Sequence, residues 1–181
     1  MGVTAIYDGI IIATGALRLK QHRPFSILFV DHRTMRRLSV RTSPVHGRGV
    51  FALSDLVSGE LLLEYKGLHL SWREAQRLHA RSNAEDSHTF LFGLDDGSVI
   101  DGAQGGNSAH WFNHSCAPNC EAEQDGVRVF IRAIRSIEKG QELFIDYRLT
   151  VDGWRTAAVR RMYACRCLTE ACRGTMLSGR N

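Results

Sequence analysis

Three cysteines lie close together near the end of this 181-residue sequence, at a C-x-C-x4-C spacing that lets three thiolates converge on one metal ion. They are Cys165, Cys167 and Cys172. Structural zinc takes four ligands, so one more ligand must come from elsewhere in the chain. The segment NHSCAPNC, residues 113–120, offers Cys116 and Cys120, and spacing alone does not choose between them. The sequence therefore predicts a zinc site that ties the tail to an earlier loop.

The alternative interpretation of these residues is a set of buried free thiols, since cysteine is common in protein cores. The residues around the cluster are mostly small and polar, which is unusual for a core segment. We therefore expect a tail with little apolar surface of its own. Zinc binding would contribute on the order of 10 kcal/mol to its folding. Five cysteines in all argue against a disulfide framework and for a reducing, intracellular compartment.

Five segments of the chain together resemble the SET-domain family of protein lysine methyltransferases, including its post-SET zinc segment. The similarity runs from about residue 38 to residue 177, with the segments in the order of the family. The resemblance implies a mostly β fold (β+α) of several small curved sheets with few short helices, a C-terminal pseudoknot and a zinc-bound post-SET tail. The segments are HGRGVFAL (46–53), GELLLEYKG (59–67), GNSAHWFNHSCAPNC (106–120), GQELFIDY (140–147) and CRCLTEACRGTML (165–177).

The resemblance also implies a domain organisation and an activity. It divides the chain into an N-terminal segment of unknown role (1–36), a SET domain (37–148) and a post-SET segment (149–177). The implied reaction transfers a methyl group from S-adenosyl-L-methionine to a lysine side chain of a protein, such as a histone or a histone-like basic protein. In the family the fourth zinc ligand directly follows His-Ser, which makes Cys116 the ligand and leaves Cys120 outside the site.

Several residues match positions that bind the cofactor in the family. The glycines of HGRG let the backbone approach the methionine end of the ligand, and the Asn-His pair of NHSC contacts it. Trp154 would either stack on the adenine or anchor the tail helix. The implied cofactor residues are His46, Gly47, Arg48, Gly49, Phe90, Asn113, His114 and Trp154.

Two tyrosines match catalytic positions of the family, Tyr147 of the Asp-Tyr motif and Tyr65 of the lysine channel. Two other channel positions depart from the family pattern. Phe90 stands where a tyrosine is usual, and Ile145 stands where Phe or Tyr is usual. Because Ile145 is smaller and offers no hydroxyl, we expect higher methylation states to be permitted. His88 and His110 match no role in the family and are expected to be partly exposed.

The elements expected to position these residues are short β-strands and two helices. The strands are bounded by Gly, Asp and Ser, as is typical of a β-rich domain. A helix is predicted over residues 71–83, with Ser71 and Glu74 as its capping box and Trp72, Ala75 and Leu78 on one apolar face. A weaker helix is predicted over 154–164. The expected strands are GVFAL (49–53), ELLLEY (60–65), HTFLFGL (88–94), SVID (98–101), VRVFIRAI (127–134) and ELFIDY (142–147).

Composition limits the other function classes. The net charge of +4 is small and scattered, and no basic stripe with interleaved aromatics supports a nucleic-acid-binding zinc module. The apolar N-terminal stretch lacks the features of a signal peptide, and no window is apolar enough to span a membrane. We expect an intracellular enzyme, cytoplasmic in a bacterium and nuclear in a eukaryote or a host. The competing hypothesis is a weakly active or inactive SET module used for protein binding.

Overall fold

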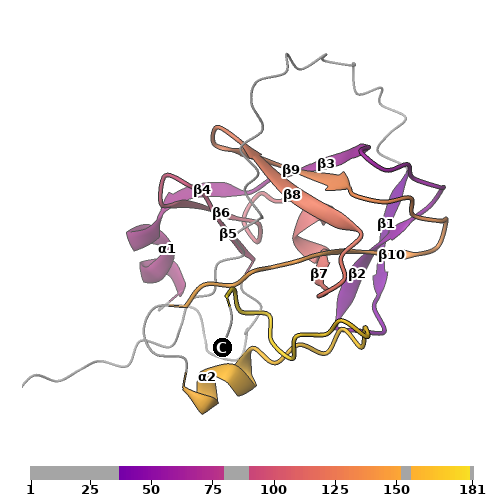
Figure 1. Ribbon diagram of the computed structural model, residues 1–181. Coiled ribbons are helices and arrows are strands. Elements are labelled where there is room, and N and C mark those ends of the chain that lie inside the picture. The colour runs from indigo at the N-terminus through magenta and orange to yellow at the C-terminus, as the bar shows by residue number, and fades with distance from the viewer. Residues whose placement is uncertain (1–36, 80–89, 152–155, 180–181) are drawn as a thin grey trace, which may run out of the picture.

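The computed structural model describes residues 37–79, 90–151 and 156–179, and its strands form three small sheets (Figure 1). One sheet has four strands and the other two have three each. The helices of the described residues are short. The predicted mostly β fold with several small sheets and few helices is therefore confirmed. Within these residues, no helix is both long enough and apolar enough to cross a membrane.

The four-stranded sheet joins segments that are far apart in the sequence. β1 (Leu38–Thr42) and β2 (Arg48–Ala52) form an antiparallel hairpin, and β10 (Glu142–Ile145) pairs with β2 in antiparallel orientation. β7 (Asn113–His114) lies parallel to β10 on its other side. The Asn-His pair of NHSC is thus held beside the strand that leads to Tyr147.

The second sheet consists of β3 (Leu61–Tyr65), β9 (Arg128–Ala133) and β8 (Cys120–Asp125), paired antiparallel in that order. The sequence predicted β3 and β9 but not β8. β8 reads CEAEQD, and only its buried Cys120 and Ala122 face the core. Two apolar residues are too few to reveal a half-buried strand by alternation.

The third sheet has the order β4–β6–β5, with β4 (Leu68–Ser71), β6 (Ser98–Asp101) and β5 (Leu91–Gly93) paired antiparallel. α1 (Trp72–His79) follows β4 directly and contacts both β4 and β6. Only residues from 90 onward of the predicted strand 88–94 lie within the described chain.

The predicted capping box of α1 is present. The backbone N–H of Ser71 donates to the Glu74 carboxylate at 2.9 Å, and the N–H of Glu74 donates back to the Ser71 hydroxyl at 3.3 Å. Ala75 is buried and Trp72 packs beside it, as the apolar face requires. Leu78, the third residue predicted on that face, is instead 40% exposed. Leu78 lies one turn beyond Ala75, where it is absent from the small apolar cluster under the helix.

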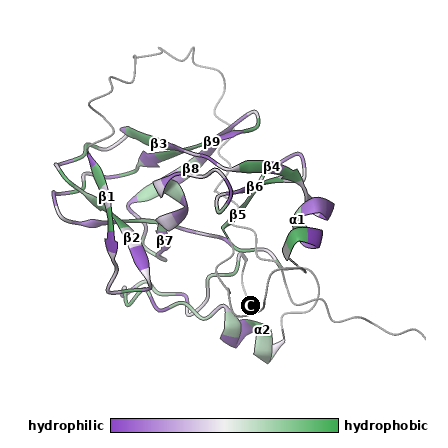
Figure 2. Ribbon diagram, turned by 180° about the vertical axis from the view of Figure 1, so that it is seen from behind, coloured by the Kyte–Doolittle hydropathy of each residue, from purple (hydrophilic) through white to green (hydrophobic). Residues whose placement is uncertain are grey.

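One apolar core takes side chains from all three sheets and from the 3-10 helix η2 (Ser108–Trp111) with its following residue. Figure 2 shows hydrophobic colour along much of the strands, whereas α1 has both hydrophobic and hydrophilic parts. Each fully buried aliphatic or aromatic side chain contributes about 1.5–3 kcal/mol, so this core supplies a rigid base for the site. Its largest fully buried members include Phe112, Leu56, Ile100, Ile131, Ile137 and Leu143.

The tail returns to the domain with its own small apolar cluster of Leu149, Tyr163 and Leu177. α2 (Ala157–Met162) is capped by Thr156 and has no buried residue, as expected for a helix with a solvent-exposed face. The tail thus has little apolar surface, as expected, but the sequence did not predict that these three residues meet. The sequence does not reveal this cluster, because its three residues are far apart in the chain and meet only after the tail turns back.

Candidate active site and metal centre

The HGRG turn is fixed by the side chain of Asn113. The Asn113 amide nitrogen donates to the carbonyl oxygens of His46 at 3.1 Å and Arg48 at 2.9 Å, and to Glu142 at 2.8 Å. All three partners are acceptors, which determines which way the amide faces. Gly47 adopts a φ of +49°, a conformation in which glycine has no steric penalty. Two of the predicted cofactor segments are thus joined directly.

The buried carboxylate of Glu142 links Asn113 to the residues that precede the HGRG turn. Besides the bond from Asn113, Glu142 accepts a bond of 2.9 Å from the Ser43 hydroxyl, and both residues are buried. Ser43 in turn accepts from the backbone N–H groups of Val45 and His46. Gly49 lies against Glu142 so closely that a Cβ there would be 2.0 Å from a carboxylate oxygen. Gly49 is therefore required for packing.

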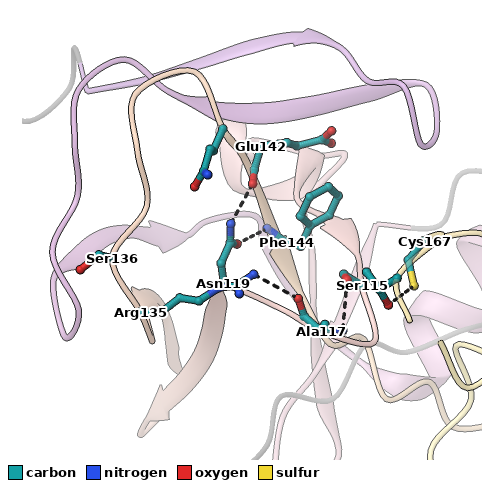
Figure 3. A pocket seen from close by; sticks show the side chains of 10 residues that line it. Ser115, Ala117, Asn119, Arg135, Ser136, Glu142, Phe144 and Cys167 are labelled. Carbon is teal, nitrogen blue, oxygen red and sulfur yellow. Dashed lines mark hydrogen bonds between the residues drawn. The ribbon is translucent and has the colours of Figure 1, made fainter. Parts of the chain in front are cut away.

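Asn119, at the end of NHSCAPNC, pairs with β10 as a strand would. Its amide nitrogen donates to the carbonyl of Glu142 at 2.8 Å, and its amide oxygen accepts from the N–H of Phe144 at 2.7 Å (Figure 3). The side chain is 4% exposed. The NHSC loop is thereby fastened to β10 at both ends, by the β7 pairing and by Asn119.

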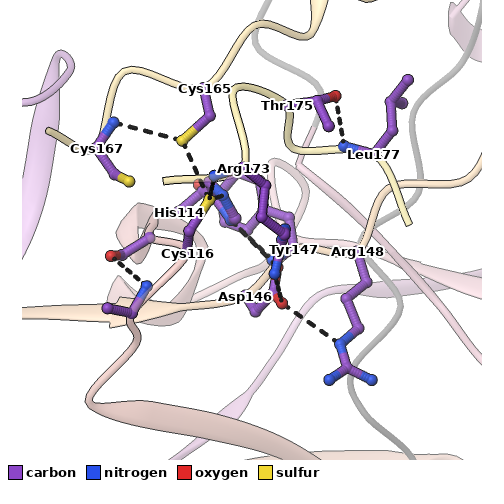
Figure 4. Close-up of polar contacts among 12 residues, drawn as sticks. His114, Cys116, Asp146, Tyr147, Arg148, Cys165, Cys167, Arg173, Thr175 and Leu177 are labelled. Atoms are coloured by element: carbon purple, nitrogen blue, oxygen red, sulfur yellow. Dashed lines mark hydrogen bonds and ion pairs between the residues drawn. The ribbon is translucent and has the colours of Figure 1, made fainter. Parts of the chain in front are cut away.

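Four cysteines converge next to this loop. The sulfur atoms of Cys116 and the three tail cysteines all lie within 4.8 Å of one another, and those of Cys116 and Cys165 are 3.6 Å apart (Figure 4). Four sulfurs bound tetrahedrally at about 2.3 Å from zinc would be about 3.8 Å apart. The cluster therefore fits a zinc ion without large movement. Burial raises the pKa of the Cys167 thiol, but bonds from the Thr169 hydroxyl and backbone N–H groups outweigh this and lower it.

Cys120 lies apart from this cluster. It is fully buried in the main core, and burial raises the pKa of its thiol to about 12. A thiol that stays protonated in an apolar environment is a poor metal ligand. The geometry thus places Cys116, and not Cys120, with the tail cysteines.

His114 connects the cysteine cluster to the Asp-Tyr segment. Its Nδ1 accepts from the backbone N–H of Tyr147 at 3.1 Å, and its Nε2 lies 3.4 Å from the sulfur of Cys116. Burial lowers the pKa of His114 to about 4, against the opposing charge of Asp146. The ring is therefore neutral with its proton on Nε2, where it can donate to the sulfur.

The two predicted catalytic tyrosines both have their hydroxyls tied to backbone carbonyls. Tyr147 donates to Phe112 at 2.7 Å and Tyr65 donates to Phe90 at 2.8 Å. Burial raises the pKa of Tyr147, and the Glu142 carboxylate adds to this. Burial also raises the pKa of Tyr65, as do the nearby Tyr147 and Asp101. Both phenols are thus protonated at neutral pH.

Residues 47–148 match the family described as SET domain. The chain belongs to the SET-domain family. The match covers more than half of the chain and ends where the predicted post-SET segment begins. It includes the HGRG turn from Gly47 onward, the NHSC loop and the Asp-Tyr motif.

The SET domain is also similar to curated and solved proteins. Histone-lysine N-methyltransferase ash1 of Drosophila melanogaster is 34% identical over 134 residues, which are 72% of this chain and 6% of that protein. The histone-lysine N-methyltransferase, H3 lysine-4 specific, of Neurospora crassa is 31% identical over 137 residues, 73% of this chain and 10% of that protein. This chain therefore spans only a small part of these relatives. A chain in the crystal structure of the Chaetomium thermophilum polycomb repressive complex 2 is 30% identical with a TM-score of 0.53, covering 61% of this chain and 15% of that chain.

An aromatic cluster borders the HGRG turn of the SET domain. The ring of Phe90 lies 4.7 Å from that of His110 and 5.1 Å from that of Trp111, and the Arg48 guanidinium stands 5.0 Å above the Trp111 ring. His110 is half-buried, and its Nδ1 atom has no hydrogen-bond partner among the described residues. The sequence did not predict that His110 and Trp111 belong to this aromatic cluster, because both lie in a 3-10 helix with no apolar periodicity.

Two other predicted site residues have different outcomes. Ile145 is 4% exposed and packs in the main core of the SET domain. Trp154, the candidate adenine contact, lies outside the described residues, as does His88, for which no role was predicted. The functions predicted for Ile145 and Trp154 stay predictions.

A pocket of about 380 Å³ lies on the side of β10 where Asn119 is bound (Figure 3). Neither of the two predicted catalytic tyrosines lines it, and no residue of the HGRG turn does. It shares Asn119 and Glu142 with the network that holds the NHSC loop. The lining residues are Ser115, Ala117, Asn119, Arg135, Ser136, Gln141, Glu142, Phe144, Cys167 and Thr169.

Proposed function

We propose that this SET domain is a protein-lysine N-methyltransferase that uses S-adenosyl-L-methionine. The observation that carries the proposal is the joining of the HGRG turn, the Asn-His pair and Tyr147 through Asn113 and His114. The relatives named above are histone-lysine N-methyltransferases, which supports a basic, chromatin-associated protein as substrate and a nuclear location if the host cell is eukaryotic.

The residues of the turn have the chemistry that this cofactor needs. His46, Gly47 and Arg48 are exposed, so their backbone groups and the Arg48 guanidinium are accessible to the carboxylate of an amino acid. The Arg48–Trp111 stack adds an aromatic surface. When bound, S-adenosyl-L-methionine supplies a methyl group on a positively charged sulfur, which leaves with the bonding electrons as a neutral thioether.

The attacking lysine must first lose its proton. With a pKa of about 10.4, this costs roughly 4 kcal/mol at about pH 7.4. Burial near Tyr65 and Tyr147 removes water from the ammonium and lowers its pKa, so a strong base is not required. The protonated phenols cannot take that proton, and we assign them to orientation of the amine and the methyl group.

Tyr147 is suited to the methyl group. Its O–H donates to the Phe112 carbonyl, which fixes the direction of the phenol and leaves lone pairs on its oxygen as acceptors. Polarised methyl C–H groups form weak but directional bonds to such oxygens. Alignment of donor and acceptor then contributes the larger part of the rate enhancement.

The zinc ion has a structural role in this proposal. Cys116, Cys165, Cys167 and Cys172 would hold it, with no position left for a substrate. Zinc would fasten the tail beside His114 and so complete the site around Tyr147.

Label transfer tests the proposal. Purified protein is incubated with methyl-labelled S-adenosyl-L-methionine and core histones, and a lysate of the source organism is a second substrate pool. We expect label in lysines of one protein, lost in Tyr147→Phe while cofactor binding measured by calorimetry is retained. Cofactor binding without transfer to either pool would reject the proposal and favour a binding module.

A further inference from the structure

A second connection between the tail and the active site does not involve a cysteine. The guanidinium of Arg173 donates to both carboxylate oxygens of Asp146, at 2.8 Å from Nη1 and 2.6 Å from Nη2 (Figure 4). Arg173 directly follows the metal-cluster residue Cys172, and Asp146 directly precedes Tyr147. The backbone N–H of Arg173 also donates to the sulfur of Cys116 at 3.3 Å. One residue therefore contacts both the cysteine cluster and the Asp-Tyr motif.

The position of Asp146 determines that of the catalytic tyrosine. The rigid peptide between Asp146 and Tyr147 carries the N–H that donates to His114. Arg148 also approaches Asp146, with its Nε atom 3.4 Å from Oδ2. The unprotonated Nδ1 of His114 lies 3.5 Å from Oδ1 and does not bond to it. A carboxylate held by two guanidinium groups cannot shift without moving the tyrosine that follows it.

An ordinary surface ion pair would contribute little, typically 0–1 kcal/mol. The Arg173 pair differs because its two parallel bonds fix geometry as well as charge, and because the Asp146 side chain is only 13% exposed. The chain contains a matched pair without these connections. Arg128 binds both oxygens of Glu64 at 2.7 and 2.8 Å, between β9 and β3, with its own side chain 58% exposed.

We propose that Arg173 is a positioning residue for methyl transfer, which holds Asp146 and thereby places Tyr147, separately from the metal ion. This role rests on the proposed methyltransferase function. The tail then has two fastenings. The cysteine cluster anchors it, and the guanidinium sets the alignment of the active-site strand.

Arg173→Lys tests the role, because lysine keeps the charge but cannot bind both oxygens in the same plane. We expect kcat to fall at least about tenfold, since small misplacements of reacting groups are costly. The KM for the cofactor and a zinc content of about one ion per chain should stay within twofold of the wild type. Arg128→Lys, the matched control, should leave kcat unchanged. Asp146→Asn combined with Arg173→Lys should be no slower than the slower single variant.

Hydrogen exchange separates this proposal from the proposed activity, because it needs no substrate. In Arg173→Lys with zinc bound, the amide of Tyr147 should exchange faster, while the amide of Ile131 in the core should not change. If the wild type transfers no methyl group, the proposed activity fails. Unchanged exchange at Tyr147 would then also overturn the positioning role of Arg173. A normal kcat in Arg173→Lys, or a loss of zinc that accounts for the defect, would likewise overturn that role.

Discussion

Replacing Glu142 by glutamine should loosen the HGRG turn without removing any residue predicted to touch the cofactor. The carboxylate accepts one bond from Ser43 and one from Asn113, and it is 8% exposed. Glutamine has the same shape and can still accept from Asn113. Its NH₂ group then faces the Ser43 hydroxyl, which already accepts from the N–H groups of Val45 and His46.

The size of the effect follows from these contacts. A hydrogen bond to a charged group contributes about 1.5–3 kcal/mol and a neutral one about 0.5–1.5 kcal/mol. Glu142→Gln converts one charged bond to a neutral one and weakens the other, but it also removes the cost of burying a charge. We expect a net loss of about 1–3 kcal/mol. If about 1.4 kcal/mol of this falls on the turn, the Kd for the cofactor rises about tenfold.

Denaturant unfolding and calorimetric titration with S-adenosyl-L-methionine measure the two quantities. Glu123→Gln is the control, because Glu123 is a partly exposed carboxylate paired with Arg132 at the surface, where the loss should be below about 1 kcal/mol. An unchanged unfolding midpoint together with an unchanged Kd in Glu142→Gln would refute the reasoning. A stability loss with no change in Kd would show that the network supports the core but not the turn.

Three further predictions concern the metal, the pH and the product. Cys116→Ser should lose zinc and release the tail to protease, whereas Cys120→Ser should keep zinc, as metal analysis and limited proteolysis would show; equal zinc loss in both would contradict the assignment. Burial lowers the pKa of His110 below its ordinary 6.5, so the unfolded chain binds a proton at this residue before the folded chain does. The free energy of unfolding therefore decreases as the pH falls below 6.5. His110→Gln should therefore narrow the difference in unfolding midpoint between about pH 7.5 and pH 5.5, and an unchanged difference would count against it. Ile145→Tyr should shift products toward lower methylation by mass spectrometry, and an unchanged ratio would show that this position does not set the product.

The sequence predicted the cysteine cluster and the family more fully than the strands around them. The cysteine spacing indicated three ligands, and the family resemblance selected Cys116, which the geometry places in the cluster. The apolar runs located β2, β3, β6, β9 and β10 because their buried residues are contiguous or alternate clearly. β8 and the two-residue β7 have no such pattern. They pair only because neighbouring strands bring acceptors and donors to them.

The supporting network could not be predicted for a different reason. Ser43, Asn119 and Glu142 are polar residues that look like ordinary turn or surface residues in the sequence. Ser43 and Glu142 are 99 positions apart and still form a buried hydrogen bond. Buried polar side chains need partners, but sequence alone does not show which ones meet. Gly49 is similar, because a Cβ at this position would collide with Glu142 and press on Asn113, which are both distant in the sequence.

Tyr147 is positioned by several contacts, some of which come from the tail. The Asp-Tyr motif lies at the end of β10, where the strand leaves the main sheet, so Tyr147 has no further strand to fix it. His114 holds its backbone, Phe112 its hydroxyl, and Arg173 the residue before it. The first two contacts come from the segment 106–120 and the third comes from the tail, and the two segments meet at the sulfur of Cys116. Because the tail buries only a small apolar cluster, zinc held by the four cysteines would contribute to keeping these segments together.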